Sequence, residues 1–489
     1  MSDDGAAEFG YRSSLSRGVG RFGSFAAGVS YISILTGTFQ LFSFGFALGG
    51  PAYWWSWPIV FVGQLAVALC FAELAARYPV AGSVYNWSKR LAGPTVGWLA
   101  GWLMAAATIV TLAAVVLAYQ ATLPQIWSGF QLIGDGTGAS FSVNAVLWGA
   151  ALIAFTTVVN ARGVRLMARI TSVGVLIELI AAVLLVIVLA VNVVHPPSVL
   201  LDTRGYGDGS PGGYVGAFLI AAIASAYVMY GFDTAGSLSE ETVDPRRTAP
   251  TAILRAVTAS FVLGGLILLL GILAAPDLGD PALGQAWGGL QRVVLQVLGG
   301  PLGTVFLFCV VVAITVCALA VHTAGIRLIF AMARDTALPA SRMLARVDPV
   351  RGMSAAPALL VGVLAVLILV VSIGTPSIFT AVTSVAVILI YLAYLLVTVP
   401  LLVARLRGRW PAAEPGRFSL GRAGLPVTLV AVLWGAAMTV NLAWPRVEVY
   451  GAPLRYSAVI VIAVVVGIGL TWFLLRGRRR LGALPEHAL

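Results

Sequence analysis

Residues 226–242, which read AYVMYGFDTAGSLSEET, decide how the chain is interpreted. The stretch begins inside an apolar run and reaches Asp233 while still at the depth of a membrane span. An acid at the centre of a membrane helix costs roughly 2.5–3.5 kcal/mol, so its side chain is expected to face protein or a water-filled cavity. The neighbouring Gly231 lets the backbone leave helical geometry, which lipid permits only where the freed groups line a site. This pattern predicts a transporter binding site. The alternative is a packing glycine beside an aspartate at a helix end.

The composition points to a membrane protein. Of the 489 residues, 60% are hydrophobic and only 10% are charged, whereas soluble domains are roughly 25% charged. Apolar runs of about 20 residues, each long enough to cross a bilayer as a helix, recur along the chain. We therefore predict an all-α polytopic membrane protein with twelve transmembrane helices. The expected spans are 22–48, 54–76, 94–123, 141–160, 167–194, 214–239, 250–274, 301–332, 354–373, 377–403, 425–444 and 456–475.

The net charge of +11 follows the loops between these spans. With the N-terminus inside, all basic residues but Arg204, Arg292, Arg446 and Arg455 fall in segments on the cytoplasmic side. The positive-inside rule then predicts a cytoplasmic tail at 1–21, a cytoplasmic loop at 404–424 and a cytoplasmic tail at 476–489. We expect the protein in the plasma (inner) membrane. These charges orient the chain in the lipid bilayer and do not indicate a nucleic-acid partner. They give no information about the oligomeric state.

Two spans carry a glycine interruption in the middle of the apolar run. Thr36 and Gly37 lie midway along the first span, and Tyr230 and Gly231 lie midway along the sixth. The second interruption comes five spans after the first, and because five is odd, a second copy of a five-span unit must insert upside down. We predict a ten-helix inverted-repeat core at 22–403 with broken first and sixth helices, and two peripheral helices at 425–475. Glycines that serve only close helix packing are the alternative.

Two further ionisable residues lie inside spans. Glu178 belongs to the fifth span, and His322 is the only histidine within any span. A carboxyl in such surroundings is neutral, paired or lining a cavity. Glu178 is therefore our first candidate for proton coupling, with Asp233 and His322 in reserve. The alternatives are a carboxyl that only stabilises helix packing and a histidine that only makes hydrogen bonds inside the protein.

The remaining patterns concern the edges of the bundle. A short amphipathic helix with Tyr85 and Trp87 is expected along the interface, with an external counterpart at about 287–298. Arg327, Arg334 and Asp335 are expected to form cytoplasmic salt bridges. The three cysteines lack metal-ligand spacing, and we expect neither a metal nor a cofactor.

Four segments resemble a known family when taken together: SYISILTGTFQLFSFGFALGGP (30–51), CFAELAARYPVAGSVYNWSKRLAGP (70–94), YGFDTAGSLSEETVDPRRTAP (230–250) and RLIFAMARDTALPASR (327–342). They are similar to the amino acid–polyamine–organocation (APC) permease superfamily, most closely to its amino acid/choline branch of GABA-type and choline-type permeases. The resemblance implies a five-plus-five inverted repeat of the leucine-transporter kind, with two appended helices.

The resemblance also implies a site. The first break would fall on Leu35-Thr36-Gly37, whose exposed backbone amides would meet a substrate carboxylate, and Tyr227 would take the aromatic lid position. The implied substrate-binding residues are Ile34, Leu35, Thr36, Gly37, Tyr227, Tyr230, Gly231 and Phe232.

The chain departs from the family pattern where a coupling ion would bind. The resemblance implies sodium between the first break and hydroxyls of the eighth helix, but 316–320 reads VCALA and offers no hydroxyl pair. Some proton-coupled relatives carry a lysine on the fifth helix near the sodium-equivalent position. The corresponding position in this chain is close to Glu178. We therefore expect protons, or exchange without coupling.

The resulting hypothesis is a secondary active permease for an amino acid or small amine, driven by protons. The alternatives are a choline, polyamine or GABA-type permease, or an exchanger without proton coupling. An aromatic cage for choline would draw on Tyr31, Tyr227, Tyr230 and Phe232. The sequence has no Walker A motif, which would have indicated that ATP drives transport. A membrane enzyme would need a cluster of acids and histidines or a set of metal ligands, which the sequence lacks. A channel would need rings of carbonyls or charges.

Overall fold

The structure, a computed structural model, describes residues 19–478 except 137, 211, 348–354, 372, 374–377 and 413. Most of the two expected tails therefore lies outside the described residues. Within them every regular element is a helix, and the one β-type contact is an isolated bridge between Val19 and Thr242. Helices dominate because hydrocarbon offers no partner for backbone amides and carbonyls, which must then bond within their own segment.

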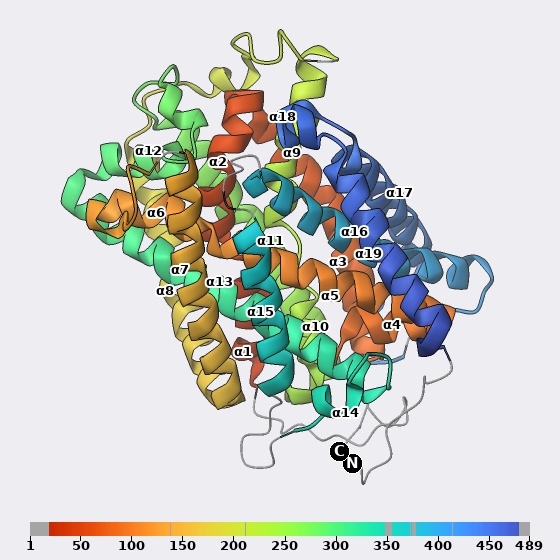
Figure 1. The fold of residues 1–489 in the computed structure, drawn as a ribbon. Coiled ribbons are helices and arrows are strands. Elements are labelled where there is room, and N and C mark those ends of the chain that lie inside the picture. Colours follow the sequence, from red (N-terminus) through yellow and green to blue (C-terminus); the bar gives the residue numbers. More distant parts are fainter. Residues whose placement is uncertain are drawn as a thin grey trace.

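The helices follow the expected spans closely. They are α1 (Arg21–Ile32), α2 (Ile34–Gly49), α3 (Ser56–Arg77), α4 (Ser83–Ala92), α5 (Pro94–Val116), α6 (Ala118–Ile126), α7 (Gly138–Arg162), α8 (Val164–Val191), α9 (Gly213–Val228), α10 (Thr234–Ser237), α11 (Pro245–Leu273), α12 (Gly289–Leu298), α13 (Gly300–Arg334), α14 (Ser341–Leu344), α15 (Ala355–Val371), α16 (Ile378–Leu406), α17 (Gly424–Ala443), α18 (Val447–Tyr450) and α19 (Ser457–Trp472). Figure 1 shows them as one bundle.

Ten helical segments in the described part of the chain are long and apolar enough to cross a membrane. The two remaining expected spans coincide with shorter apolar helices, α9 and α15. Helix α9 is short because the chain leaves helical geometry directly after it. The prediction of an all-α polytopic membrane protein is confirmed.

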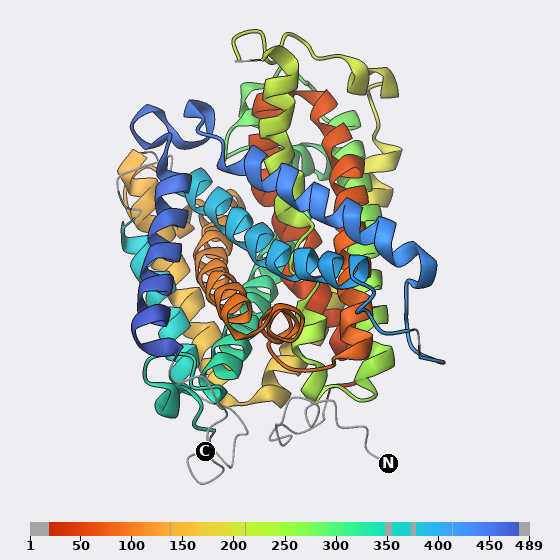
Figure 2. The ribbon, with the colours of Figure 1, turned by 90° about the vertical axis from the view of Figure 1, so that its right-hand side faces the viewer.

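The centre of the bundle contains the helices that carry the candidate residues. Helix α2 packs on α9, α1 packs on α8, α11 and α13, and α5 packs on α13 and α16. Helices α17 and α19 run along the outside (Figure 2) and are the most exposed of the ten spanning segments. The peripheral position expected for the last two spans matches this arrangement.

The short helix α4 is buried more deeply than expected. We predicted that it lies along the interface, but Tyr85 and Trp87 are both fully buried. The Tyr85 hydroxyl donates to Asp335 Oδ2 at 2.5 Å, and Trp87 Nε1 donates to the Tyr78 carbonyl at 2.9 Å. Because both polar groups find partners inside the protein, the aromatic side chains of α4 pack inward.

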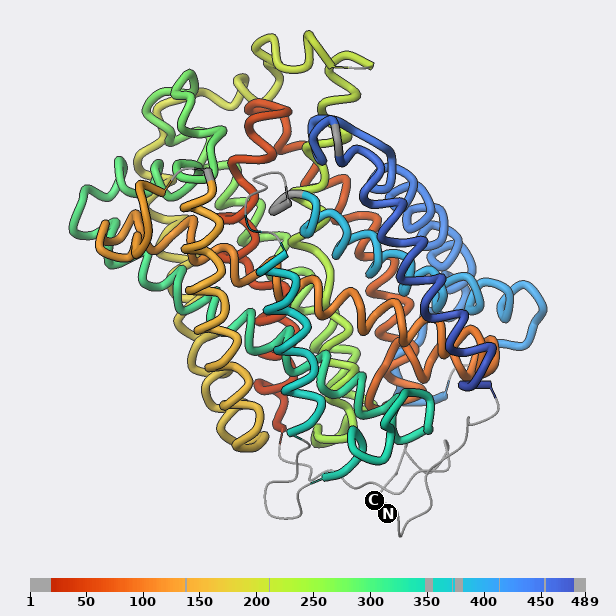
Figure 3. Tube along the Cα trace, viewed as in Figure 1, coloured from red at the N-terminus to blue at the C-terminus, as the bar shows by residue number. Residues whose placement is uncertain are grey.

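Several of the connections expected in the cytoplasm lie at the same end of the molecule. In the trace of Figure 3, the start of α1, the turn between α7 and α8, and α14 lie toward the bottom, and the connection before α9 lies at the top. We expect a cysteine placed at Arg407, in the loop after α16, to be cytoplasmic and one placed at Asp208 to be external. Labelling of single-cysteine variants in intact cells with an impermeant reagent checks this. Labelling of the cysteine at position 407 without permeabilisation would contradict the expected orientation.

Candidate functional site

The first spanning helix is broken at Ser33, which has φ 41° and ψ 94° and separates α1 from α2. We expected the break at Leu35-Thr36-Gly37, but these three residues are helical. Gly37 serves close packing instead, because a Cβ there would lie 2.6 Å from Cγ2 of Val228 on α9. The glycine thus marks where α2 and α9 approach each other, and the break lies one turn earlier.

The second break follows α9 and includes Met229 to Asp233, as expected. Gly231 has φ 86°, and a Cβ on it would lie 1.9 Å from Cδ1 of Tyr31. The Tyr31 ring therefore packs on the bare backbone of Gly231 and joins the two breaks. Tyr230 continues this contact, since its ring centroid lies 6.1 Å from that of Tyr31 and 5.5 Å from that of Tyr227.

Glu178 lies at the first break. Its side chain extends from α8 and is fully buried. Oε1 accepts hydrogen bonds from the Ser33 hydroxyl at 2.9 Å and from the Leu35 amide at 3.1 Å, and Oε2 has no partner among the described residues. A carboxylate is favoured here because the first amides of a helix are unpaired and its dipole is positive. The Leu35 amide, which the resemblance assigns to a substrate carboxylate, thus binds a carboxylate of the chain itself.

Asp233 lies at the second break and is also buried. Oδ1 accepts a hydrogen bond from the Tyr394 hydroxyl of α16 at 2.5 Å, and Oδ2 accepts one from Ser83 of α4 at 3.3 Å. The same Tyr394 oxygen accepts from the Gly231 amide at 3.0 Å. Phe232, between them, is buried with its ring centroid 5.5 Å from that of Tyr394. Tyr394 therefore satisfies both an amide and an acid that the break leaves without helical partners.

His322 lies in a different contact. Its Nε2 is 2.9 Å from the Ala358 carbonyl of α15, and its Nδ1 is 2.9 Å from the Thr156 hydroxyl of α7. A carbonyl only accepts, so Nε2 carries the proton and the ring bridges three helices. The structure therefore brings Glu178 and Asp233 to the two breaks, and it places His322 between α13, α7 and α15.

Ser83 and Tyr394 contribute to the site but were not among the residues predicted from the sequence. The signal for Tyr394 was a hydroxyl within an apolar span, which needs a partner when buried. Facing the first break, the Cys317 thiol of α13 lies 3.5 Å from the Tyr31 carbonyl. No group of three histidine, cysteine or acidic side chains suited to a metal ion occurs in the part of the chain that the structure describes.

Tyr227 is the candidate lid, buried with its hydroxyl 3.5 Å from Gln40 Oε1. We expect Tyr227→Ala to slow uptake strongly, because it removes the ring that packs against Tyr230. Uptake by reconstituted protein measures this. Tyr53, which lies between the first two expected spans, is fully buried against Phe42 and is unsuitable as a control. Tyr456, half-exposed before α19, serves instead, and equal losses in the two variants would remove the basis for a lid at Tyr227.

Two buried ion pairs lie beyond the second break, between α13 and the segment that follows α10. Arg327 donates to Glu241 from Nε at 2.9 Å and from Nη2 at 3.1 Å, and Arg334 donates to Glu240 from both Nη atoms at 3.2 and 3.0 Å. Lys89 of α4 pairs with Asp335 at 2.5 Å. The expected basic and acidic residues do form salt bridges, but with partners on other elements. The two arginine pairs fasten α13 to the segment after α10, and the Asp335 pair fastens the end of α13 to α4.

We expect Glu241→Gln to lower the free energy of unfolding by about 3 kcal/mol or more, because it leaves the buried Arg327 charge without its partner. Thermal unfolding of purified protein measures this. The matched control is Glu414→Gln, which removes an exposed carboxylate 3.6 Å from Arg77 and is expected to cost at most about 1 kcal/mol. A Glu241→Gln protein as stable as the control would contradict the assignment.

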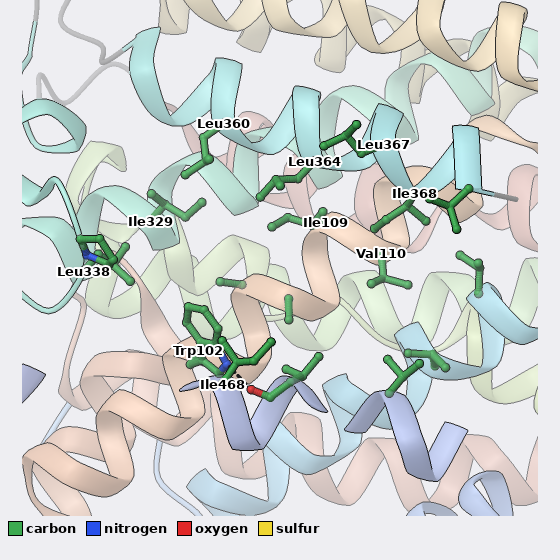
Figure 4. A pocket seen from close by; sticks show the side chains of 18 of the residues that line it. Trp102, Ile109, Val110, Ile329, Leu338, Leu360, Leu364, Leu367, Ile368 and Ile468 are labelled. Carbon is green, nitrogen blue, oxygen red and sulfur yellow. Dashed lines mark hydrogen bonds between the residues drawn. The ribbon is translucent and has the colours of Figure 1, made fainter. Parts of the chain in front are cut away.

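A cavity of about 950 Å³ lies between α5, α15, α16 and α19, away from both breaks. Trp102, Ile109, Leu364 and Ile468 contribute to its wall (Figure 4), and Ser457 is the one polar side chain among its lining residues. None of the candidate site residues lines it. Such a lining suits hydrocarbon, whereas the residues at the two breaks are packed against one another and buried.

Comparison with known proteins gives a consistent result. The sequence profile of the family described as "Amino acid permease" matches residues 19–466. An amino-acid permease of Arabidopsis thaliana is 28% identical over 96% of this chain and 94% of its own length. A methylthioribose transporter of Bacillus subtilis is 29% identical over 69% of the chain and 71% of its own length. A thiamine transporter of Schizosaccharomyces pombe is 26% identical over 93% of the chain and 82% of its own length.

Proposed function

Because the chain belongs to the amino acid permease family of the APC superfamily, which matches residues 19–466, we propose that it moves an amino acid or small amine across the plasma membrane by proton-coupled alternating access. The family itself establishes a multi-pass membrane transporter for a small molecule, and the chain is not an enzyme. The finer proposal rests on Glu178 of α8, whose buried carboxylate binds the start of α2 at the break of the first spanning helix.

The proposed architecture is the twelve-helix, five-plus-five inverted repeat with both termini in the cytoplasm. Its support is the position of the two breaks, at Ser33 in the first expected span and at 229–233 in the sixth. Residues 22–403 would form the transport core, and α17 and α19 would be the appended helices. Substrate would bind between Ile34–Gly37 and Tyr227–Phe232, near the middle of the bilayer.

In the proposed mechanism Glu178 carries the proton. As a carboxylate it holds α8 to the start of α2 through the Ser33 hydroxyl and the Leu35 amide. A proton arriving on the unpartnered Oε2 neutralises the buried charge and weakens these bonds, since a neutral acid is a poorer acceptor. Proton binding thereby favours one arrangement of the helices over the other, which is the requirement for coupling. Asp233 is held by two hydroxyl donors and is the second candidate.

A reconstituted transport assay tests the proposal. A thermal-shift screen of purified protein against amino acids, polyamines and quaternary amines selects the compound to be labelled. Proteoliposomes with an imposed inward proton gradient are expected to accumulate it, and an ionophore that collapses the gradient is expected to end accumulation. Accumulation that requires sodium at constant pH would contradict proton coupling, and exchange without accumulation would favour the exchanger.

A further inference from the structure

The charges at the two breaks are all negative. Glu178 and Asp233 are buried there, and neither has a cationic partner among the described residues. The buried arginines of α13, Arg327 and Arg334, are each held in an ion pair by Glu241 and Glu240. When Glu178 carries a proton, Asp233 still leaves the region acidic. The surroundings of a bound substrate therefore attract positive charge.

The donors that would hold a substrate carboxylate already have acceptors. The Leu35 amide at the start of α2 donates to Glu178, and the Gly231 amide donates to Tyr394. In broken transporter helices the half-helix N-terminus is where an anionic substrate group binds. Here that position is filled by an acid of the chain, whether or not the acid is protonated, because a neutral carboxyl still accepts through its carbonyl oxygen.

The side chains between the breaks suit an organic cation. Tyr31, Tyr227 and Tyr230 form a buried aromatic group, and ring faces attract ammonium ions, most strongly where water is excluded. The Tyr31 hydroxyl is buried with these rings, and its oxygen can accept a hydrogen bond from an ammonium N–H. Helices α1 and α9 both end at the breaks, and their C-terminal carbonyls add negative potential.

We propose that the substrate is a small organic cation without a carboxylate, and that Glu178 excludes carboxylate-bearing substrates by occupying the start of α2. This inference rests on the proposed transport function. It narrows the substrate class from amino acids and amines to amines, including quaternary ammonium compounds.

Matched pairs of compounds test the inference on purified and reconstituted protein. Choline and glycine betaine share the trimethylammonium group and differ in the carboxylate, as do cadaverine and lysine. At least one amine is expected to raise the unfolding temperature and to be taken up, with its carboxylated partner at least about tenfold weaker. An acid that binds as tightly as its amine overturns the inference and leaves the transporter standing. Uptake of neither kind, by protein that unfolds cooperatively, overturns the transport proposal and this inference with it.

Two variants of Glu178 sharpen the test. Glu178→Ala frees the Leu35 amide at the start of α2, so the carboxylated member of the pair is expected to gain about tenfold in affinity. Glu178→Gln keeps an acceptor oxygen at the same place, so the preference for the amine is expected to persist. If both variants gain affinity for the carboxylated compound, Glu178 does not exclude it by occupying the start of α2. The same conclusion follows if neither variant gains affinity while Glu178→Ala stays folded. If Glu178→Ala fails to fold, the compound pairs on the parent protein decide the matter.

Discussion

Gly231→Ala is expected to abolish uptake. The residue has φ 86°, and an added Cβ would lie 1.9 Å from the Tyr31 ring. The left-handed conformation costs an alanine about 1–2 kcal/mol, and overpacking adds typically about 1–3 kcal/mol. Because the ring cannot move without separating the two breaks, the strain falls on the site itself. Initial rates of uptake by reconstituted protein, normalised to the amount inserted, measure the loss.

Gly408→Ala is the matched control for this prediction. Gly408 also has a positive φ, 62°, but no atom lies within 4 Å of the added Cβ. The control carries the same kind of conformational penalty without the clash, so its uptake is expected to stay close to that of the parent. A Gly231→Ala protein with parental uptake would show that the backbone contact between Tyr31 and Gly231 is unnecessary for transport.

Glu178→Gln is expected to abolish accumulation against a gradient while leaving exchange of substrate across the membrane intact. Glutamine keeps the length and an acceptor for the Ser33 hydroxyl and the Leu35 amide, but it cannot take up a proton. The measurement compares the ratio of internal to external substrate under an imposed pH difference with the rate of equilibrium exchange. Exchange is the internal control for folding and substrate binding.

Glu448→Gln provides the control for the loss of an acid as such, because Glu448 is exposed and lies outside the spans. This variant is expected to accumulate substrate like the parent. Parental accumulation by Glu178→Gln would assign Glu178 to helix packing alone. Loss of both accumulation and exchange would indicate that the carboxylate is needed to hold the site together.

The spans could be predicted because lipid leaves the backbone few choices, and a run of apolar residues therefore fixes a helix almost by itself. The second break was also predictable, since Gly231 and Asp233 interrupt such a run together. The first break was placed too late because Gly37 was taken to form it. Ser33 forms the break instead, and its hydroxyl bonds to Glu178. Gly37 packs against α9, as glycines commonly do at helix contacts.

The partners of the buried acids could not be predicted from one sequence. That Glu178 bonds to Leu35, or Asp233 to Tyr394, depends on which faces of distant helices meet, and the spacing of residues along each helix does not state this. The same limit applies to Tyr53. A tyrosine between two spans resembles a loop residue, yet its ring is fully buried against Phe42.

Proton movement during transport tests the central claim most directly. Proteoliposomes that hold a pH-sensitive dye, with the membrane potential clamped by potassium and valinomycin, receive substrate on the outside. We predict that the lumen acidifies as substrate enters through the parent protein, and that Glu178→Gln abolishes the acidification while substrate still exchanges. Substrate entry without acidification in the parent, or equal acidification in the variant, would contradict this prediction.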